Sequence, residues 1–381
     1  MKRIIKEIHG EEKGPTLVFF GGIHGNEKAG VIALQEVLKN IKPDELNGSI
    51  YAISGNLKAL EKNQRYINQD LNRLWTRDNI NTIKNKNTLN NEEKELLKLL
   101  YFLERILKIK SGPFYFFDLH TTSSKTLPFI TINDALINRK FSKLFPVPIV
   151  LGIEEYLNGP LLSYINTLGY LSLGFESGQH VDVRSIENNL AFINLVLHYT
   201  GAINKAEAYN LEYYNQLKEE SKSLNRFFEI THLHSINKKD SFKMYEGFKS
   251  FQKINKGAKI ARNNKEDIYS KHDARIFMPL YQKKGAEGFF IIRDIKPFYL
   301  KMSIFLRRIK IDNLLVLFPG ISWQNKREGV LKVNLKVAKF FAKPIFHALG
   351  YRNRQVTKTH MNLYNRERVA KTRMYKEESW Y

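Results

Sequence analysis

Two short motifs carry side chains that bind metal ions. In the first, His24 and Glu27 stand three residues apart, directly after an apolar, β-rich run that ends in paired glycines. In the second, Asp118 stands two residues before His120, at the end of another apolar run. Sites in open α/β sheets form at the carboxyl ends of strands, so we expect the two motifs to meet at one edge. Two His and one Glu are typical of catalytic zinc with one position left for water, and Asp118 is expected to orient a ligating imidazole.

A lone His-x-x-Glu pair arises often by chance, and its ordinary interpretation is structural. The placement of both motifs at the ends of predicted strands favours the metal site instead. The sequence has no cysteine, so any metal site must use His, Asp or Glu. This donor set favours zinc over other divalent ions.

Two further segments could serve catalysis. Residues 64–73 hold Arg65 and Arg73 among polar side chains, and arginine can grip a carboxylate with two hydrogen bonds. An ordinary surface loop is the alternative. Glu176 lies near the end of a predicted strand beside glycine and could act as a general base. A buried Glu paired with arginine is the alternative there, and His180 is left without a role.

Other chemistries find little support. There is no Gly-x-Ser-x-Gly elbow, no P-loop and no dinucleotide-binding glycine pattern. His232 and His234 lie two apart in a strand-like run, so they share a face and could bind metal. Packing between strands explains such a pair more often than metal binding does.

Strand and helix patterns alternate through the first half of the chain, which indicates an α/β fold with a largely parallel sheet covered on both faces. The apolar runs predict strands at 16–22, 49–54, 114–120, 147–151 and 170–176, and helical spacing predicts helices at 29–40, 91–110 and 188–198.

Three regions are expected. Residues 1–205 form the α/β domain, 206–295 form a smaller, mainly β domain with glycine and lysine turns, and 296–381 form a basic, partly helical region. Within the last region, residues 333–349 show a helical pattern interrupted by Pro344.

The charge of the chain is uneven. The net charge is +23, and residues 296–381 carry 19 Lys and Arg against 5 Asp and Glu, a net charge of +14. Such asymmetry can mark a surface for nucleic acid or anionic membrane, although a solvated basic face is the simpler interpretation. The start of the chain has no secretory signal pattern, and no apolar run is long enough to span a membrane. A soluble, cytoplasmic protein is therefore expected.

Taken together, the motifs resemble the succinylglutamate desuccinylase/aspartoacylase family, a branch of the zinc carboxypeptidase-like hydrolases. The matching segments are Gly21–Glu27, Asp118–His120, Arg65–Arg73 and Gly174–His180, and the likeness is firm over residues 15–200. The resemblance implies a zinc carboxypeptidase-like domain with a mixed, largely parallel sheet flanked by helices.

The resemblance also implies roles for the residues of these motifs. His24, Glu27 and His120 would hold one Zn²⁺ per chain, and Glu176 would be the general base. Arg65 would polarise the scissile carbonyl, while Asn72 and Arg73 would hold a substrate carboxylate. Asn166 departs from the pattern, because members that act on N-acetylaspartate carry a substrate-binding arginine there.

The predicted function is amide hydrolysis in an N-acyl amino acid or a related small anionic substrate, by zinc-activated water with a Glu base. One alternative is a metallocarboxypeptidase in which Arg73 binds the terminal carboxylate of a peptide. Another is a nucleic-acid or anionic-surface binding protein that keeps a vestigial hydrolase fold. Its basic region lacks interleaved base-stacking motifs, so nucleic acid is not the expected partner.

Overall fold

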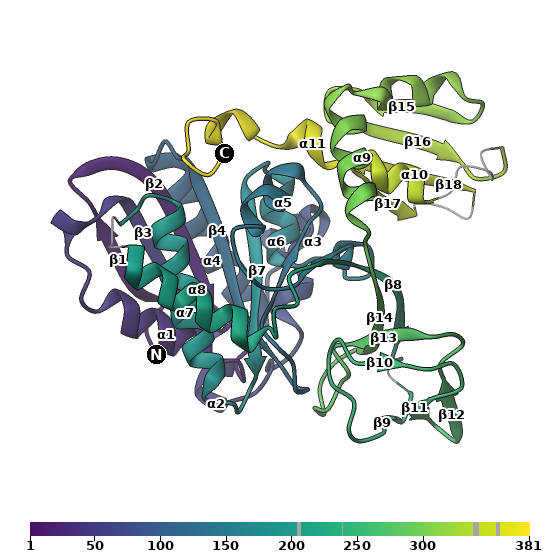
Figure 1. The fold of residues 1–381 in the computed structure, drawn as a ribbon, viewed down its shortest axis with the longest axis horizontal. Helices are drawn as coiled ribbons and strands as arrows, with labels where there is room; N and C mark the ends of the chain where they lie inside the picture. Colours follow the sequence, from purple (N-terminus) through teal and green to yellow (C-terminus); the bar gives the residue numbers. More distant parts are fainter. Residues whose placement is uncertain (204–206, 238, 338–342, 356–358) are drawn as a thin grey trace.

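The computed structural model describes residues 1–203, 207–237, 239–337, 343–355 and 359–381. Figure 1 shows three lobes: a large lobe of sheet and helices built from the first half of the chain, a β lobe, and a small lobe near the C-terminus. The first two share one continuous eleven-stranded sheet.

The large sheet is mixed. In order across the sheet its strands are β1 (Ile4–His9), β3 (Asn47–Ser54), β2 (Glu12–Gly21), β4 (Phe114–Thr122), β7 (Leu171–Gln179), β5 (Phe129–Ile132), β6 (Ile149–Leu151), β8 (Phe227–Ser235), β14 (Glu287–Asp294), β13 (Ala274–Phe277) and β10 (Lys253–Ile254). The central strands β3, β2, β4 and β7 run parallel, whereas β5 pairs with β7 antiparallel. The predicted α/β class with a largely parallel sheet is confirmed, and every strand predicted in the first half of the chain is present.

Helices cover both faces of the large sheet. They are α1 (Ala29–Leu38), α2 (Leu57–Lys62), α3 (Arg77–Lys84), α4 (Asn91–Ile109), α5 (Leu136–Ser142), α6 (Leu161–Thr167), α7 (Arg184–Tyr199) and α8 (Glu207–Glu220). One apolar core lies under α1, α5, α7 and α8, and a second lies under α3, α4 and α6. The strands between these cores are buried on both sides, which explains why they read as unbroken apolar runs.

The strand order reverses between β2 and β4. From β2 the chain crosses to β3 on one side, and it returns through α2, α3 and α4 to β4 on the other side. Such a reversal opens a crevice outside the carboxyl ends of the two strands, where ligands of open α/β sheets bind. The motif with His24 directly follows β2, and His120 lies near the end of β4.

The β lobe extends the same sheet. β8 is parallel to β6 and antiparallel to β14, so the sheet continues from the large lobe into the β lobe without a break. A separate sheet of β9 (Phe242–Met244), β11 (Lys259–Asn263) and β12 (Glu266–Tyr269) packs beside it. The β lobe therefore has a fixed position against the crevice.

The C-terminal lobe contains a sheet that the sequence patterns did not predict. Its four antiparallel strands are β15 (Ile321–Asn325), β16 (Val330–Asn334), β18 (His360–Asn365) and β17 (Tyr351–Gln355). Its helical segments are α9 (Pro297–Arg308), η4 (Ile311–Leu317), α10 (Lys343–Ala348) and α11 (Arg366–Val369).

The helical prediction for 333–349 is correct only in part. Residues 333–334 end β16 and α10 covers 343–348, while 338–342 lie outside the described residues. The alternation of Leu331 and Val333 was hidden because Val333 also fits a helical stripe with Val337. Among the described helices, none combines the length and the apolar character that crossing a membrane requires.

Candidate active site

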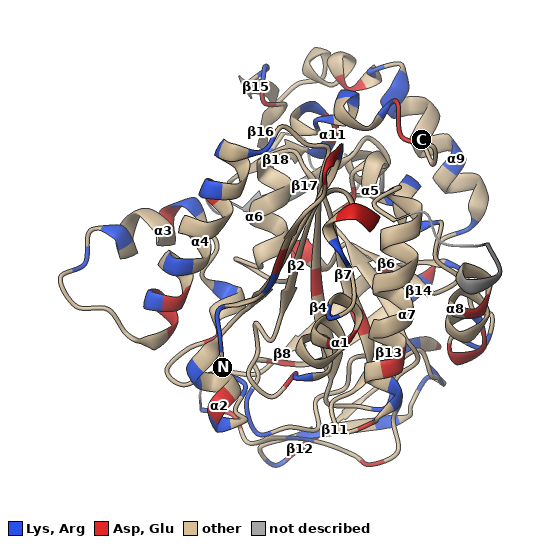
Figure 2. Ribbon diagram, turned by 90° about the vertical axis from the view of Figure 1, so that its left-hand side faces the viewer, with Lys and Arg blue, Asp and Glu red and all other residues tan. Residues whose placement is uncertain are grey.

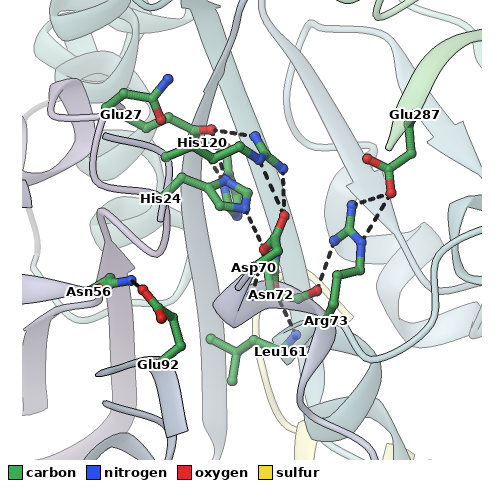
Figure 3. A network of polar contacts seen from close by, with 12 residues as sticks. His24, Glu27, Asn56, Asp70, Asn72, Arg73, Glu92, His120, Leu161 and Glu287 are labelled. Carbon is green, nitrogen blue, oxygen red and sulfur yellow. Dashed lines mark hydrogen bonds and ion pairs between the residues drawn. The ribbon is translucent and has the colours of Figure 1, made fainter. Parts of the chain in front are cut away.

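The three predicted metal ligands lie together at the switch point of the sheet, which is the crevice where the strand order reverses between β2 and β4. One ligand atom from each of His24, Glu27 and His120 can be chosen so that all three lie within 4.8 Å of one another. The Nδ1 atom of His24 is 2.8 Å from Glu27 Oε1, and the Nδ1 atom of His120 is 2.8 Å from Glu27 Oε2. All three side chains are buried. The two imidazoles thus approach a single carboxylate from two sides (Figure 3).

The second nitrogen of each imidazole faces another carboxylate. His24 Nε2 lies 3.0 Å from Asp70 Oδ1, and His120 Nε2 lies 2.8 Å from Asp118 Oδ2. A carboxylate behind a metal-binding histidine fixes the tautomer and the ring orientation. Both rings are therefore held with Nδ1 directed toward Glu27, as a pair of metal ligands would need.

The turn that carries His24 requires glycine for close packing. A Cβ on Gly25 would lie only 2.0 Å from the backbone carbonyl carbon of Ala59 in α2. The backbone N–H of Gly25 donates to the carbonyl of Arg65 at 3.1 Å. The first motif and the arginine-containing segment are thus joined through their backbones.

The electrostatics of these groups are strongly coupled. Burial acts to raise the pKa of Glu27, but the charges and hydrogen bonds of His24 and His120 hold it well below its usual value. Burial acts to lower the pKa of His120, but Asp118 and Glu27 raise it well above its usual value. Negative charge concentrated around two imidazoles is an environment that a divalent cation can neutralise. The donor set and its orientation therefore fit zinc.

Glu176 stands beside this group on the neighbouring strand. In the register of β4 with β7 it lies directly opposite His120. Burial raises the pKa of Glu176 to about 8, and the nearby charges of Glu27 and Asp118 add to this against the opposing effect of His120. Its Oε2 atom is buried without a hydrogen-bond partner among the described residues. A buried carboxyl oxygen with no partner is available for proton transfer.

Asp70 organises the arginine-containing segment. Its Oδ2 atom accepts hydrogen bonds from Arg65 at 3.3 Å from Nε and 3.0 Å from Nη2, while its Oδ1 atom faces His24. The Nη1 atom of Arg65 lies 3.5 Å from Glu27 Oε1. The backbone N–H of Asn72 also donates to Asp70, and the Asn72 side chain accepts from the backbone of Leu161. The segment is therefore anchored at the site and is not a free surface loop.

Arg73 has an acidic partner from the β lobe. Its Nε and Nη2 atoms donate to Glu287 Oε1 at 3.2 and 2.9 Å, and its Nη1 atom donates to the carbonyl of Asn72 at 2.8 Å (Figure 3). Both side chains are only partly exposed, with 24% and 18% of their surface accessible. Each terminal nitrogen carries a second hydrogen, so the edge between Nη1 and Nη2 still has two donors.

One cavity of about 120 Å³ lies between the large lobe and the β lobe, and its lining includes His24, Glu27, Arg65, Asn72, Arg73, His120 and Glu176. The β lobe supplies Gln282 and Glu287, and Gln282 Oε1 contacts both Asn26 Nδ2 at 2.9 Å and His180 Nε2 at 3.3 Å. His180 also lies 2.7 Å from Thr121 Oγ1. Asn166 is buried in α6 and does not line this cavity.

Sequence reasoning missed three residues of the site. Asp70 was visible inside the arginine-containing segment, and its spacing of five from Arg65 was the available signal. Glu287 and Gln282 reach the cavity only through long-range sheet pairing, and no local pattern marks them. His234 stacks on Phe242 and Phe289, which agrees with packing as the role of that histidine.

The fold and site define an α/β protein with a buried His-Glu-His group at the switch point of its sheet. Residues 13–200 match the model of the succinylglutamate desuccinylase/aspartoacylase catalytic domain. This part of the chain therefore belongs to the succinylglutamate desuccinylase/aspartoacylase family, as the motifs indicated.

Relatives and solved structures agree with this assignment. The chain is 31% identical over 154 residues to an aspartoacylase of Danio rerio, covering 38% of this chain and 44% of the relative. It is 36% identical over 74 residues to a succinylglutamate desuccinylase of Photorhabdus laumondii, covering 19% of this chain and 23% of the relative. The matches thus span less than half of either relative.

The fold resembles the crystal structure of a succinylglutamate desuccinylase/aspartoacylase from Rhodobacter sphaeroides. The TM-score is 0.57 at 16% identity, over 76% of this chain and 88% of that one. This similarity extends the common fold beyond the matched catalytic domain.

Proposed function

We propose that this chain is a zinc-dependent hydrolase that cleaves an amide bond in an N-acyl amino acid or a related small anionic substrate, with residues 1–205 as its catalytic unit. The observation that carries the proposal is the approach of two oriented imidazoles to Glu27, beside a buried Glu176 oxygen without a partner. Metal-assisted amide hydrolysis needs a metal site and a proton acceptor next to each other.

His24, Glu27 and His120 would hold the zinc, which supplies Lewis acidity and lowers the pKa of a bound water. Glu176 accepts a proton from the attacking water and returns it to the departing nitrogen, and its raised pKa suits both transfers. Arg65 places a positive charge beside Glu27, where it stabilises the negative charge that develops on the carbonyl oxygen. Such stabilisation is commonly worth roughly 3–4 kcal/mol per donor.

Arg73 and Asn72 recognise the substrate carboxylate. Glu287 occupies the Nε side of the guanidinium, so a substrate carboxylate binds across the edge between Nη1 and Nη2. Glu287 therefore orients Arg73 and does not block it.

A hydrolysis screen tests this function. The zinc-loaded wild type is assayed on N-acyl amino acids, on their carboxyl-amidated forms and on short peptides, with Glu176→Gln as the inactive reference. The exposed Glu104, more than half accessible on α4, provides the control Glu104→Gln. We expect turnover of N-acyl amino acids by the wild type and the control only. Cleavage confined to peptides would make the protein a carboxypeptidase, and no cleavage of any amide would refute the proposal.

A further inference from the structure

Helix α9 exposes side chains that a helix in a globular protein usually buries. Phe298, Met302, Phe305 and Ile309 are 69%, 37%, 61% and 52% exposed. Their spacing of four, three and four residues places them on one face, here called the α9 stripe. A helix against a folded core normally turns such a face inward, so this orientation needs an explanation.

Charged contacts fix the orientation of α9. Its inward side carries Arg307, which donates to Asp134 Oδ2 and to Glu367 Oε1, both at 2.9 Å. Ser303 on the same side donates to the carbonyl of Ala348 at 2.7 Å. Because Arg307 and Asp134 are fully buried, a rotation that hid the stripe would break a buried ion pair.

The exposed apolar surface continues beyond the helix. Leu314, Leu317 and Phe318, in and directly after η4, are 52%, 77% and 46% exposed. Eight of the twenty large hydrophobic side chains that are exposed in the described part of the chain lie within residues 298–318. Scattered exposed hydrophobic residues are ordinary, but such a concentration marks an interaction surface.

Positive charge borders the stripe. Lys296, Lys301, Arg308 and Lys310 are exposed, and residues 296–311 contain no Asp or Glu. Figure 2 shows α9 at the outer edge of the molecule, with Lys and Arg along it. These cations are part of the net charge of +14 over residues 296–381.

Lys140 of α5 and Lys143, which directly follows this helix, extend this positive region. Burial and the charge of Arg308 lower the pKa of Lys140, and burial, Arg139 and Lys301 lower the pKa of Lys143. The cations of α5 and α9 are therefore close enough to repel one another. An anionic partner would relieve that repulsion.

We propose that the α9 stripe docks on a membrane surface that contains anionic phospholipid. Aromatic and aliphatic side chains enter the boundary between headgroups and acyl chains, while the bordering Lys and Arg contact the headgroups. A second copy of the chain fits poorly, because a symmetric interface would bring the same positive borders together. Nucleic acid fits the charge but does not use an aliphatic stripe of this kind.

Vesicle co-sedimentation of the full chain tests the proposal. Phosphatidylcholine vesicles are compared with vesicles that also contain phosphatidylserine, at low and high salt. We expect binding to the anionic vesicles that weakens at high salt. Phe298→Ser/Phe305→Ser and Lys301→Glu/Arg308→Glu should each lower the apparent affinity by about tenfold or more. Hydrolase activity in the absence of vesicles should not change, because no α9 residue lines the cavity.

Matched controls come from the exposed face of α4. Tyr101 is 62% exposed, close to Phe298 and Phe305, so Tyr101→Ser should leave vesicle binding intact. Lys94→Glu/Lys98→Glu is the corresponding charge control. No vesicle binding, equal binding to neutral vesicles, or full binding by Phe298→Ser/Phe305→Ser would each overturn the proposal. A dimer in analytical ultracentrifugation that Phe298→Ser/Phe305→Ser dissociates would assign the surface to a second copy instead.

Discussion

Charged side chains are paired and shielded from solvent in the cavity, whereas along α9 they are exposed. In the cavity, His24 and His120 are buried and the Arg65 side chain is only 12% exposed, and each faces a carboxylate within hydrogen-bonding distance. Along α9, Lys301 and Arg308 face solvent beside exposed aromatic rings. Buried charges must be paired, and pairing fixes geometry. Exposed charges fix no geometry but create a surface potential. The first arrangement suits catalysis, and the second suits recognition of an extended anionic surface.

Metal removal should have the largest effect. Dialysis against a chelator should abolish hydrolysis, because the water would lose its activating cation. Added Zn²⁺ should restore it, whereas vesicle binding by α9 should be unaffected throughout. Turnover measured before and after chelation checks this. Full activity in the chelated protein would show that the cavity works without a metal.

Arg307 and Arg308 are adjacent but belong to the two different arrangements. Arg307→Ala removes a buried cation that pairs with both Asp134 and Glu367, while Arg139 still pairs with Asp134, so it should lower the free energy of unfolding by roughly 3 kcal/mol. Arg308→Ala removes an exposed cation and should change it by less than about 0.5 kcal/mol. Urea unfolding of both variants measures the difference. Equal losses of unfolding free energy in the two variants would contradict the claim that the buried Arg307 contributes more to stability than the exposed Arg308.

Loss of the base should lower turnover without metal loss. Glu176→Gln keeps the shape of the side chain but cannot accept the proton, so turnover should fall by about 10²-fold or more. Its zinc content should match the wild type, because Glu176 is not among the three predicted ligands. Unchanged turnover on an authentic substrate would exclude Glu176 as the base.

Arg73→Lys should have the smallest effect of the four. Lysine keeps the charge but cannot form two parallel hydrogen bonds. The fall in kcat/KM should therefore correspond to a loss of roughly 1.5–3 kcal/mol of transition-state stabilisation. The loss should nearly vanish on a carboxyl-amidated substrate. Arg77→Lys, on the exposed side of α3, is the control. Equal losses on both substrates would give Arg73 a structural role.

The sequence was informative where local pattern and burial agree. Each of the strands β2, β4 and β7 contains a buried, mainly apolar run, and the polar residues that end or follow this run stand out. Their parallel order brings His24, His120 and Glu176 to one edge, so the motif positions alone indicated the site.

Long-range pairing limited the prediction elsewhere. Glu287 reaches Arg73 from 214 residues away, and only the pairing of β14 with β8 places it there. The strands β16 and β18 are only five and six residues long, so their alternation competes with a helical pattern. The α9 stripe reads in sequence as an ordinary amphipathic helix, because its outward direction depends on the tertiary contacts of Arg307.

Metal analysis of the purified chain tests the central claim most directly. The wild type, loaded with zinc and dialysed, should hold about one zinc per chain, as expected for a three-ligand catalytic site. His24→Ala/His120→Ala should hold none while remaining folded by circular dichroism. His232→Ala/His272→Ala, which removes two exposed histidines of the β lobe, should keep the full content. Stoichiometric zinc in the His24→Ala/His120→Ala variant would contradict the account.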